Sequence, residues 1–250
     1  MLTDETKCIG CGRCIPFCPV QARSFGRAAT TGRTVIVIDK DRCTECGVCE
    51  RTAPCPVDAI HQDVLEWPRQ VRGILSNPLV EFKGTGIPGR GTEEIKTNDI
   101  TGRVKYGRVG VGIEVGRPGV SARWTEVEKI SMALAKLGVE FCAENPITHF
   151  MVDKKTGKLD PAVVNEVSLS AIVEFEMAED RLPELFRVLR EEVDDKIDTV
   201  YTFEIAARLK PDGTTTVVQK IQDAGYQMLT VSKNNLGLGR PRYQDEEVPA

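Results

Sequence analysis

Eight cysteines near the start of the chain constrain its fold more than any other feature. They form two groups in which two residues separate the first three cysteines and a proline follows the fourth: Cys8, Cys11, Cys14 and Cys18 before Pro19, and Cys43, Cys46, Cys49 and Cys55 before Pro56. A disulfide-stabilised secreted scaffold is usually short and follows a signal peptide. This chain has 250 residues and keeps eight of its nine cysteines in the first quarter, which favours metal ligation.

The first group, C-x2-C-x2-C-x3-C-P, resembles the ligand run of bacterial-type ferredoxins with two [4Fe-4S] clusters, and the resemblance covers residues 1–65. In such a run the fourth cysteine binds the other cluster. The resemblance therefore implies two [4Fe-4S] clusters, with cluster one on Cys8, Cys11, Cys14 and Cys55 and cluster two on Cys43, Cys46, Cys49 and Cys18. The chain departs from the family at "ERTAP", residues 50–54, where the family has three residues instead of five. We expect this loop to lie beside cluster one and to face a partner.

Two other kinds of cysteine site fit the spacing less well. Four-cysteine zinc sites usually have two well-separated C-x2-C pairs, and radical S-adenosylmethionine enzymes use C-x3-C-x2-C, an order that neither group has. Gly10, Gly12 and Gly47 stand between ligands, where the chain would pass close to inorganic sulfide and a side chain would clash. Residues 33–39, "RTVIVID", alternate and are β-branched, which predicts the strand between the two halves of a ferredoxin module.

The resemblance implies electron transfer, and the charge pattern indicates the kind of partner. A net charge of −4 with both signs interspersed gives no broad basic surface for nucleic acid and no polybasic membrane patch. No apolar run approaches the ~20 residues that insert across a membrane, and no signal-peptide pattern is present, so we expect a cytoplasmic protein. Charges are balanced across residues 1–60, unlike in strongly acidic, freely diffusing ferredoxins. We therefore expect docking in a homo- or hetero-oligomer, as an iron-sulfur subunit or dedicated redox partner of a catalytic oxidoreductase subunit in anaerobic metabolism.

Residues 66–108 are rich in Gly, Thr and charge and lack apolar periodicity, which predicts a long linker or an arm that contacts a partner. Within this segment, the backbone amides of "GTGIPGRGT" (residues 84–92) and the side chain of Arg90 are candidates for binding an anion. The loop lacks the Lys-Ser/Thr ending of a P-loop, and no clear strand precedes it. An anion site, a partner arm and a plain connection stay open as alternatives.

Residues 109–235 have the periodicities of an α+β domain. We predict strands over 109–115, 139–143, 168–177 and 201–209, helices over 121–138 and 180–193, and an added helix and strand over 215–224 and 226–231. The first six elements have the βαββαβ order of a ferredoxin-like α/β sandwich, in which helices cover one face of an antiparallel sheet. By fold analogy, this order is also similar to that of small-molecule-sensing ACT-type modules. Residues 236–250 are predicted to be a frayed tail.

For several residues of this domain, the sequence also predicts what the side chain contacts. In the strand at 109–115, Gly110 and Gly112 leave one face nearly bare, so we expect a helix, a ligand or a partner backbone to pack there. In the strand at 168–177 one face is apolar, and the other, with Glu174, is expected to face water. The predicted helix N-caps and the predicted buried apolar thiol are Ser121, Asp180 and Cys142.

The sequence shows no catalytic constellation, and we assign no catalytic residue. The two histidines, His61 and His149, have no nucleophile or carboxylate at catalytic spacing. Arg117 and Arg240 each precede a proline beside glycines after a predicted strand, either as turn chemistry or as contacts to a shared anion. Two functions stay open beside electron transfer: a redox-linked sensor whose C-terminal domain binds a small anion, and a reductase in its own right.

Overall fold

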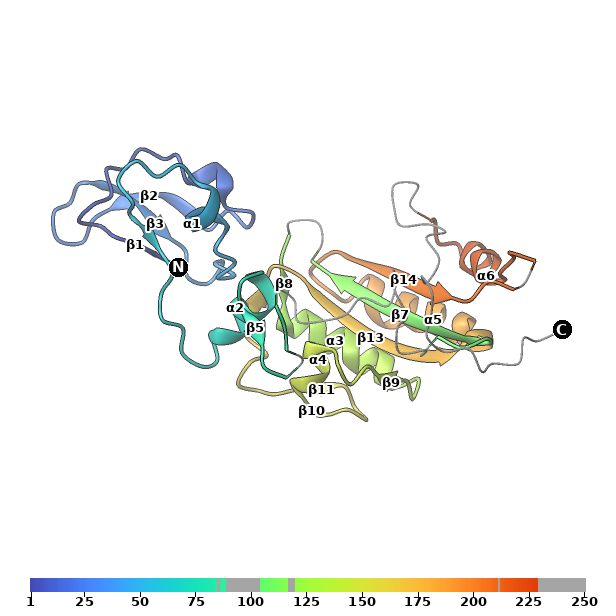
Figure 1. The fold of residues 1–250 in the computed structure, drawn as a ribbon. Coiled ribbons are helices and arrows are strands. Elements are labelled where there is room, and N and C mark those ends of the chain that lie inside the picture. The colour runs from blue at the N-terminus through green and yellow to red at the C-terminus, as the bar shows by residue number, and fades with distance from the viewer. Residues whose placement is uncertain (85, 89–103, 117–119, 211, 229–250) are drawn as a thin grey trace.

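The computed structural model describes residues 1–84, 86–88, 104–116, 120–210 and 212–228. Residues 1–65 form a small N-terminal module, and residues 104–228 form a larger C-terminal part with mixed helix and sheet (Figure 1). The expected α+β class is thus confirmed. Helix α2 (Gln70–Ser76) lies where the two parts meet.

The N-terminal module consists of short strands and single helical turns. In chain order these are β1 (Leu2–Thr3), a 3-10 turn (Ile15–Phe17), β2 (Arg23–Arg27), β3 (Thr34–Ile38), α1 (Val48–Thr52) and β4 (Ile60–His61). Strands β2 and β3 form an antiparallel hairpin, and β1 pairs with β4. The strand predicted within residues 33–39 is therefore confirmed as β3. Its partner β2 gave no signal, because "RSFGR" has no alternation of apolar residues.

Helix α2 corrects the prediction that residues 66–108 are a loop or linker throughout. Its Val71 and Leu75 are buried in the same apolar core as the C-terminal sheet. The backbone amide of Leu169 donates to Ser76 Oγ at 2.8 Å. A short hairpin of β5 (Glu81–Phe82) and β6 (Ile87–Pro88) follows. The helix has seven residues and three apolar ones, Val71, Ile74 and Leu75, which is too short a pattern for helical periodicity to be recognised.

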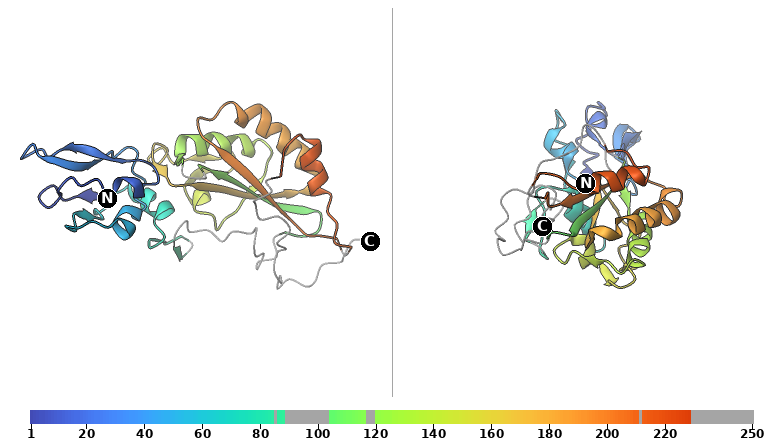
Figure 2. Two further views of the ribbon diagram at one scale, coloured as in Figure 1. Left: turned by 90° about the horizontal axis from the view of Figure 1, so that it is seen from above. Right: turned by 90° about the vertical axis from the view of Figure 1, so that its right-hand side faces the viewer.

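The C-terminal part is built on a four-stranded antiparallel sheet with helices over one face (Figure 2). The strand order is β14 (Tyr201–Ala207), β7 (Arg108–Val115), β13 (Ala171–Ala178) and β9 (Glu140–Phe141). Helices α3 (Trp124–Ala135), α5 (Leu182–Leu189) and α6 (Val217–Asp223) pack above it. Between β9 and β13 the chain inserts α4 (Pro146–His149), β10 (Met151–Asp153), β11 (Lys158–Leu159) and β12 (Val167–Ser168), and β12 pairs with β8 (Ala122–Arg123).

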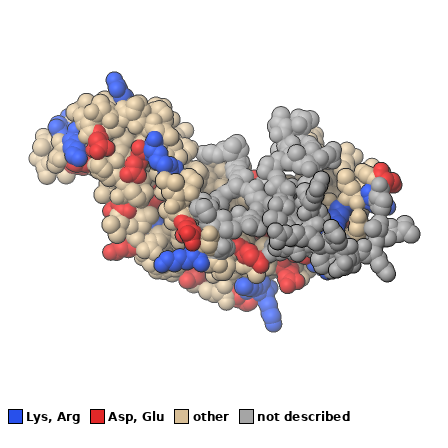
Figure 3. Space-filling model, in the orientation of Figure 1, with Lys and Arg blue, Asp and Glu red and all other residues tan. Residues whose placement is uncertain are grey.

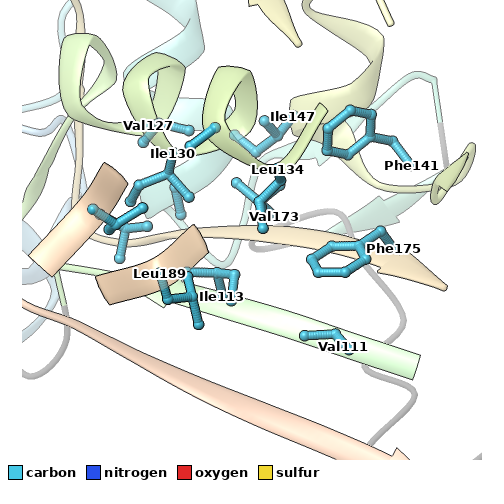
Figure 4. Close-up of a cluster of buried hydrophobic side chains, with 14 of the residues drawn as sticks. Val111, Ile113, Val127, Ile130, Leu134, Phe141, Ile147, Val173, Phe175 and Leu189 are labelled. Carbon is cyan, nitrogen blue, oxygen red and sulfur yellow. The ribbon is translucent and has the colours of Figure 1, made fainter. Parts of the chain in front are cut away.

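The core lies between this sheet and the helices. Figure 4 shows Val127, Ile130 and Leu134 of α3 pointing toward Ile113 of β7 and Val173 of β13. These residues recur at intervals of three and four on the helix and of two on the strands, so the two periodicities of the sequence bring one face of each element together. All five side chains are buried.

In the described part of the chain, α3, α5 and α6 do not pack on the glycine face of β7, so the helix predicted against the glycines is not found there. The helices pack on the opposite face, over Val111 and Ile113. On the glycine side, Glu174 of β13 and Glu204 of β14 stand opposite Gly112, and a Cβ built on Gly112 would lie 2.7 Å from Glu204 Oε1. Glutamates of the flanking strands therefore occupy the space that the glycines leave. Glu174 is 1% exposed and accepts a hydrogen bond from Asn145 Nδ2, so its expected contact with water is wrong.

Neither of the two predicted N-cap residues caps its helix. Ser121 has a φ of 75° and lies outside α3, and the amide of Trp124 at the start of the helix donates to Glu166 O at 3.0 Å instead. Asp180 lies inside a 3-10 turn (Glu179–Arg181) that leads into α5, and a π-helical turn (Arg190–Asp194) follows that helix. The added helix is present as α6, whereas the predicted last strand is absent at residues 226–228 and otherwise lies outside the described residues.

Cys142 is half-buried rather than buried, and its thiol contacts Glu144 Oε2 at 3.5 Å. In the described part of the chain, every helix is too short or too polar to cross a bilayer.

Candidate metal centre

Both cysteine groups lie on loops whose glycines have backbone angles that favour glycine. Gly10 and Gly12, in the first loop, have φ values of 66° and 74°, and Gly47, in the second, has 68°. A Cβ on Gly10 would lie 2.6 Å from the carbonyl oxygen of Thr34, and one on Gly12 would lie 2.8 Å from the ring of Phe25. The first loop therefore passes so close to β2 and β3 that only glycine fits at these two positions.

Cys18 of the first group and three cysteines of the second group line one pocket that is partly open to solvent. The three are Cys43, Cys46 and Cys49, all buried, whereas Cys18 is half-buried. They are the four residues that the family resemblance implies for cluster two. The cavity and its thiols fit a cluster held by cysteines of both groups, although the residue-by-residue assignment stays a prediction.

The remaining four cysteines differ in exposure. Cys8 and Cys14 are buried, Cys55 is half-buried and Cys11 is exposed. Within the described residues, no three Cys, His, Asp or Glu side chains lie close enough together to share a single metal ion.

Backbone amides already point at several of the sulfur atoms. Ile36 of β3 donates to Cys8 Sγ at 3.4 Å, Ala22 to Cys18 Sγ at 3.1 Å, and Ala59 to Cys55 Sγ at 3.3 Å. Amide hydrogen bonds to thiolate sulfur are among the features that set the potential of an iron-sulfur cluster. The chain therefore supplies donors to cysteines of both groups.

Burial keeps several of these cysteines protonated in the absence of metal. Desolvation raises the pKa of the Cys14, Cys43 and Cys49 thiols, and the charge of Glu45 raises that of Cys43 further. Metal binding needs the thiolate, so loading these sites must release protons.

Arg23 at the start of β2 is a buried cation among these thiols. It is 4% exposed, and its Nη1 donates to Thr3 Oγ1 at 3.2 Å and to Cys14 Sγ at 3.8 Å. Arg23 also lines the pocket of Cys43, Cys46 and Cys49. Burial opposes its charge, but attraction to Cys49 and Cys14 prevails and raises the pKa of the guanidinium. In the sequence, Arg23 is only one of the basic residues that balance the acidic ones across residues 1–60.

Glu45, between Cys43 and Cys46, anchors the second loop to α2. Its side chain is fully buried and accepts from the N-terminal ammonium and from Arg69, at 2.8 Å from Nε and 2.6 Å from Nη2. Burial opposes ionisation, but these two cations outweigh it and hold the pKa of Glu45 below its ordinary value. A buried carboxylate of this kind is stable only because it is paired.

Arg72 of α2 connects the same loop to the C-terminal part. It is 6% exposed and donates to the carbonyl oxygens of Lys40, Asp41 and Cys43 at 3.0, 3.1 and 2.8 Å. Its Nε forms an ion pair with Glu166, which precedes β12. One side chain thus touches both the second cysteine loop and the C-terminal part of the chain.

One residue of the "ERTAP" spacer, Arg51, contacts other parts of the chain. Arg51 donates to Cys46 O at 2.9 Å and to Asn77 Oδ1, at the end of α2, at 3.0 Å. Thr52 and Pro54 are exposed. The structure therefore places Arg51 against the second cysteine loop and α2, whereas the expected partner contact of the spacer stays a prediction.

The other candidate residues do not join this centre. Arg90, Arg117 and Arg240, the predicted anion contacts, lie outside the described residues. His149 packs edge-on against Phe82 with ring centroids 5.2 Å apart, and His61 lies in β4.

We predict that Gly10→Ala removes cluster one, whereas Gly32→Ala does not. Both glycines have nearly the same φ, 66° and 65°, so alanine costs about 1–2 kcal/mol at each for the left-handed backbone. Only Gly10 has a backbone atom in the way, because nothing lies within 4 Å of a Cβ on Gly32. Iron analysis of both purified variants checks this. Equal iron contents would show that the close approach of Gly10 to Thr34 is unimportant.

The comparisons with known proteins agree with this geometry. The family profile described as "4Fe-4S dicluster domain" matches residues 7–59. A ferredoxin of Rickettsia felis is 30% identical over 82 residues, which cover 31% of this chain and 66% of that ferredoxin, just under two thirds of its length. No solved structure matches the chain. The profile match ends at residue 59, before the C-terminal part.

Proposed function

We propose that this chain, whose residues 7–59 form a ferredoxin-type 4Fe-4S dicluster domain with two clusters, transfers single electrons between redox partners. The observation that carries the proposal is the pocket lined by Cys18 together with Cys43, Cys46 and Cys49, because it joins cysteines of both groups around one cavity. A cluster in that cavity accepts and gives up one electron at a time, and the protein sets its potential through charge, hydrogen bonds and exposure.

We assign the ligands on the same basis. Cluster two is held by Cys18, Cys43, Cys46 and Cys49, which line the pocket. Cluster one is held by the remaining four cysteines, Cys8, Cys11, Cys14 and Cys55. The amides of Ile36, Ala22 and Ala59 donate to ligand sulfurs, and five of the eight ligands are buried, which limits access of water.

The two clusters face different surroundings in this proposal. Beside Cys11, which is exposed, Ile9 and Phe25 are 57% and 60% exposed, an apolar surface suited to a transient redox partner. The second loop instead contacts α2 through Glu45 and Cys43. Electrons therefore enter or leave by cluster one, while cluster two serves the side toward the C-terminal part.

The wider role we propose is that of a subunit or dedicated partner of a larger oxidoreductase in anaerobic metabolism, within the cytoplasm. On the face shown in Figure 3, basic and acidic side chains are interspersed over the N-terminal module. Such a surface supports docking by shape and local contacts more than by long-range attraction of one charge sign.

Iron analysis and electron paramagnetic resonance of the anaerobically purified chain test the proposal. Two clusters of four irons give eight irons per chain, and full reduction should give two interacting spins. Four irons or fewer in fully reconstituted protein, or a spectrum without spin interaction, would contradict two neighbouring clusters. Isolation of the chain as a stable monomer that is fully active alone would contradict the role as a subunit.

A second candidate, a redox-linked sensor, is favoured by Arg72. Because Arg72 contacts the Cys43 loop and Glu166, a change at cluster two has a direct route to the C-terminal part, for which we propose an ACT-like order of elements. Amino acids and nucleotides would then bind the full-length chain with different affinity in its oxidised and reduced states. Calorimetry on both states distinguishes this function: equal affinities, or no binding, leave electron transfer alone.

A further inference from the structure

Within residues 1–65, Arg23 is the one charged side chain that is buried without an ion pair to a carboxylate. Its guanidinium donates to a hydroxyl, Thr3 Oγ1, and to a sulfur, Cys14 Sγ. Its second terminal nitrogen, Nη2, is buried and has no hydrogen-bond partner among the described residues. A buried cation without a compensating charge is strongly unfavourable, so the fold must be completed by something negative at this position.

The position of Arg23 indicates what that negative group is. On one side it touches Cys14, a ligand of cluster one in our assignment. On the other side it lines the pocket of cluster two with Cys18, Cys43, Cys46 and Cys49. Arg23 therefore lies between cysteines of both groups. Thiolates bound to a cluster carry negative charge, and reduction adds one more electron to it.

We propose that Arg23 is a positioning residue shared by both clusters, which donates to a cysteine sulfur of each and raises both reduction potentials. This inference rests on the proposed two-cluster function and ligand assignment. A fixed positive charge favours the more negative, reduced form of each cluster, and charge-assisted hydrogen bonds are the stronger ones. Because the same guanidinium serves both sites, its loss affects both potentials in the same direction.

The test compares Arg23→Met, which removes the charge, with Arg23→Lys, which keeps it, and with Arg27→Met as a control. Arg27 lies at the other end of β2 and is exposed, where it donates to Gly32 O. The midpoint potentials of both clusters are measured by redox titration followed by paramagnetic resonance, after iron analysis has shown eight irons per chain. In Arg23→Met we expect the reduction equilibrium of each cluster to fall at least tenfold, which is about 59 mV for a one-electron couple.

Arg23→Lys should shift both potentials less than Arg23→Met does, and Arg27→Met less than either. Fully loaded Arg23→Met with both potentials unchanged, or with only one shifted, overturns the shared role. A wild-type chain that holds no clusters would instead overturn the proposed function itself.

A second measurement covers the case in which Arg23→Met does not assemble its clusters. Wild-type protein grown with ¹⁵N-arginine is reduced, and pulsed paramagnetic resonance detects nitrogen nuclei near the cluster spins. We expect a ¹⁵N coupling in the wild type that disappears in Arg23→Lys. Identical spectra for the two proteins would show that the guanidinium of Arg23 does not donate to the clusters.

Discussion

Replacing Cys18 by alanine is expected to remove the cluster held by the second cysteine group and to leave that of the first group intact. The reason is that Cys18 lines the same pocket as Cys43, Cys46 and Cys49, although Cys43 lies 25 positions further along the chain. The iron content should fall from eight to four per chain, because each cluster holds four irons. Iron analysis and the loss of spin interaction in the reduced protein measure the effect.

Double variants show which cluster Cys18 serves. If Cys18 and Cys46 are ligands of the same cluster, the variant with both replaced by alanine keeps four irons. If Cys18 and Cys11 belong to different clusters, the variant with both replaced loses all of them. The opposite pair of results would mean that each group holds its own cluster. Cys142→Ala is the control, since this ninth cysteine lies in the C-terminal part and contacts Glu144.

The features that sequence predicted correctly are those fixed by covalent spacing. The cysteine spacing predicted the dicluster domain that the family profile matches, and a strand such as Val109 to Val115 must turn its alternate side chains to the same face. The buried stripe of α3 and the apolar faces of β7 and β13 follow from such periodicities. Local pattern was sufficient here because each element carries several apolar residues in register.

The features that sequence missed depend on contacts between distant residues. Helix α2 is defined by burial of Val71 and Leu75 against the C-terminal core, not by a periodic pattern of its own. Trp124 needs no side-chain cap because Glu166 O, far along the chain, accepts from its amide. Glu174 is buried opposite Gly112 and accepts from Asn145, which lies 29 positions earlier in the chain. Propensity alone does not contain these tertiary effects.

Arg23 and Arg72 were missed for a related reason. In the sequence they are two of 33 basic residues, and nothing in "QARSF" or "QVRGI" distinguishes a buried arginine from an exposed one. The available signal was indirect: each stands where its strand or helix turns one face to a cysteine loop. Only the fold shows that Arg23 reaches Cys14 and that Arg72 reaches Cys43.

Removing one partner of the Arg72–Glu166 ion pair is expected to cost about 3–5 kcal/mol of the free energy of unfolding, because the other charge is left buried and unpaired. The two side chains are only 7% and 12% exposed. Arg72→Met also removes the donors to three carbonyl oxygens of the Cys43 loop, so this variant should lose more than Glu166→Gln. Denaturant unfolding of the holoprotein under anaerobic conditions, followed by the fluorescence of the buried Trp124, measures both losses.

The matched control is the pair of Arg187 and Glu191, four residues apart on the helical surface and 61% and 56% exposed. Arg187→Met should cost no more than about 0.3–0.5 kcal/mol, because water screens an exposed pair of this kind. A double variant, Arg72→Met with Glu166→Gln, should lose less than the sum of the two single losses, since no unpaired charge remains. If Arg72→Met were as mild as Arg187→Met, the contact of Arg72 with Glu166 would not fasten the cysteine loop to the C-terminal part. The route from cluster two that the sensor function requires would then be removed as well.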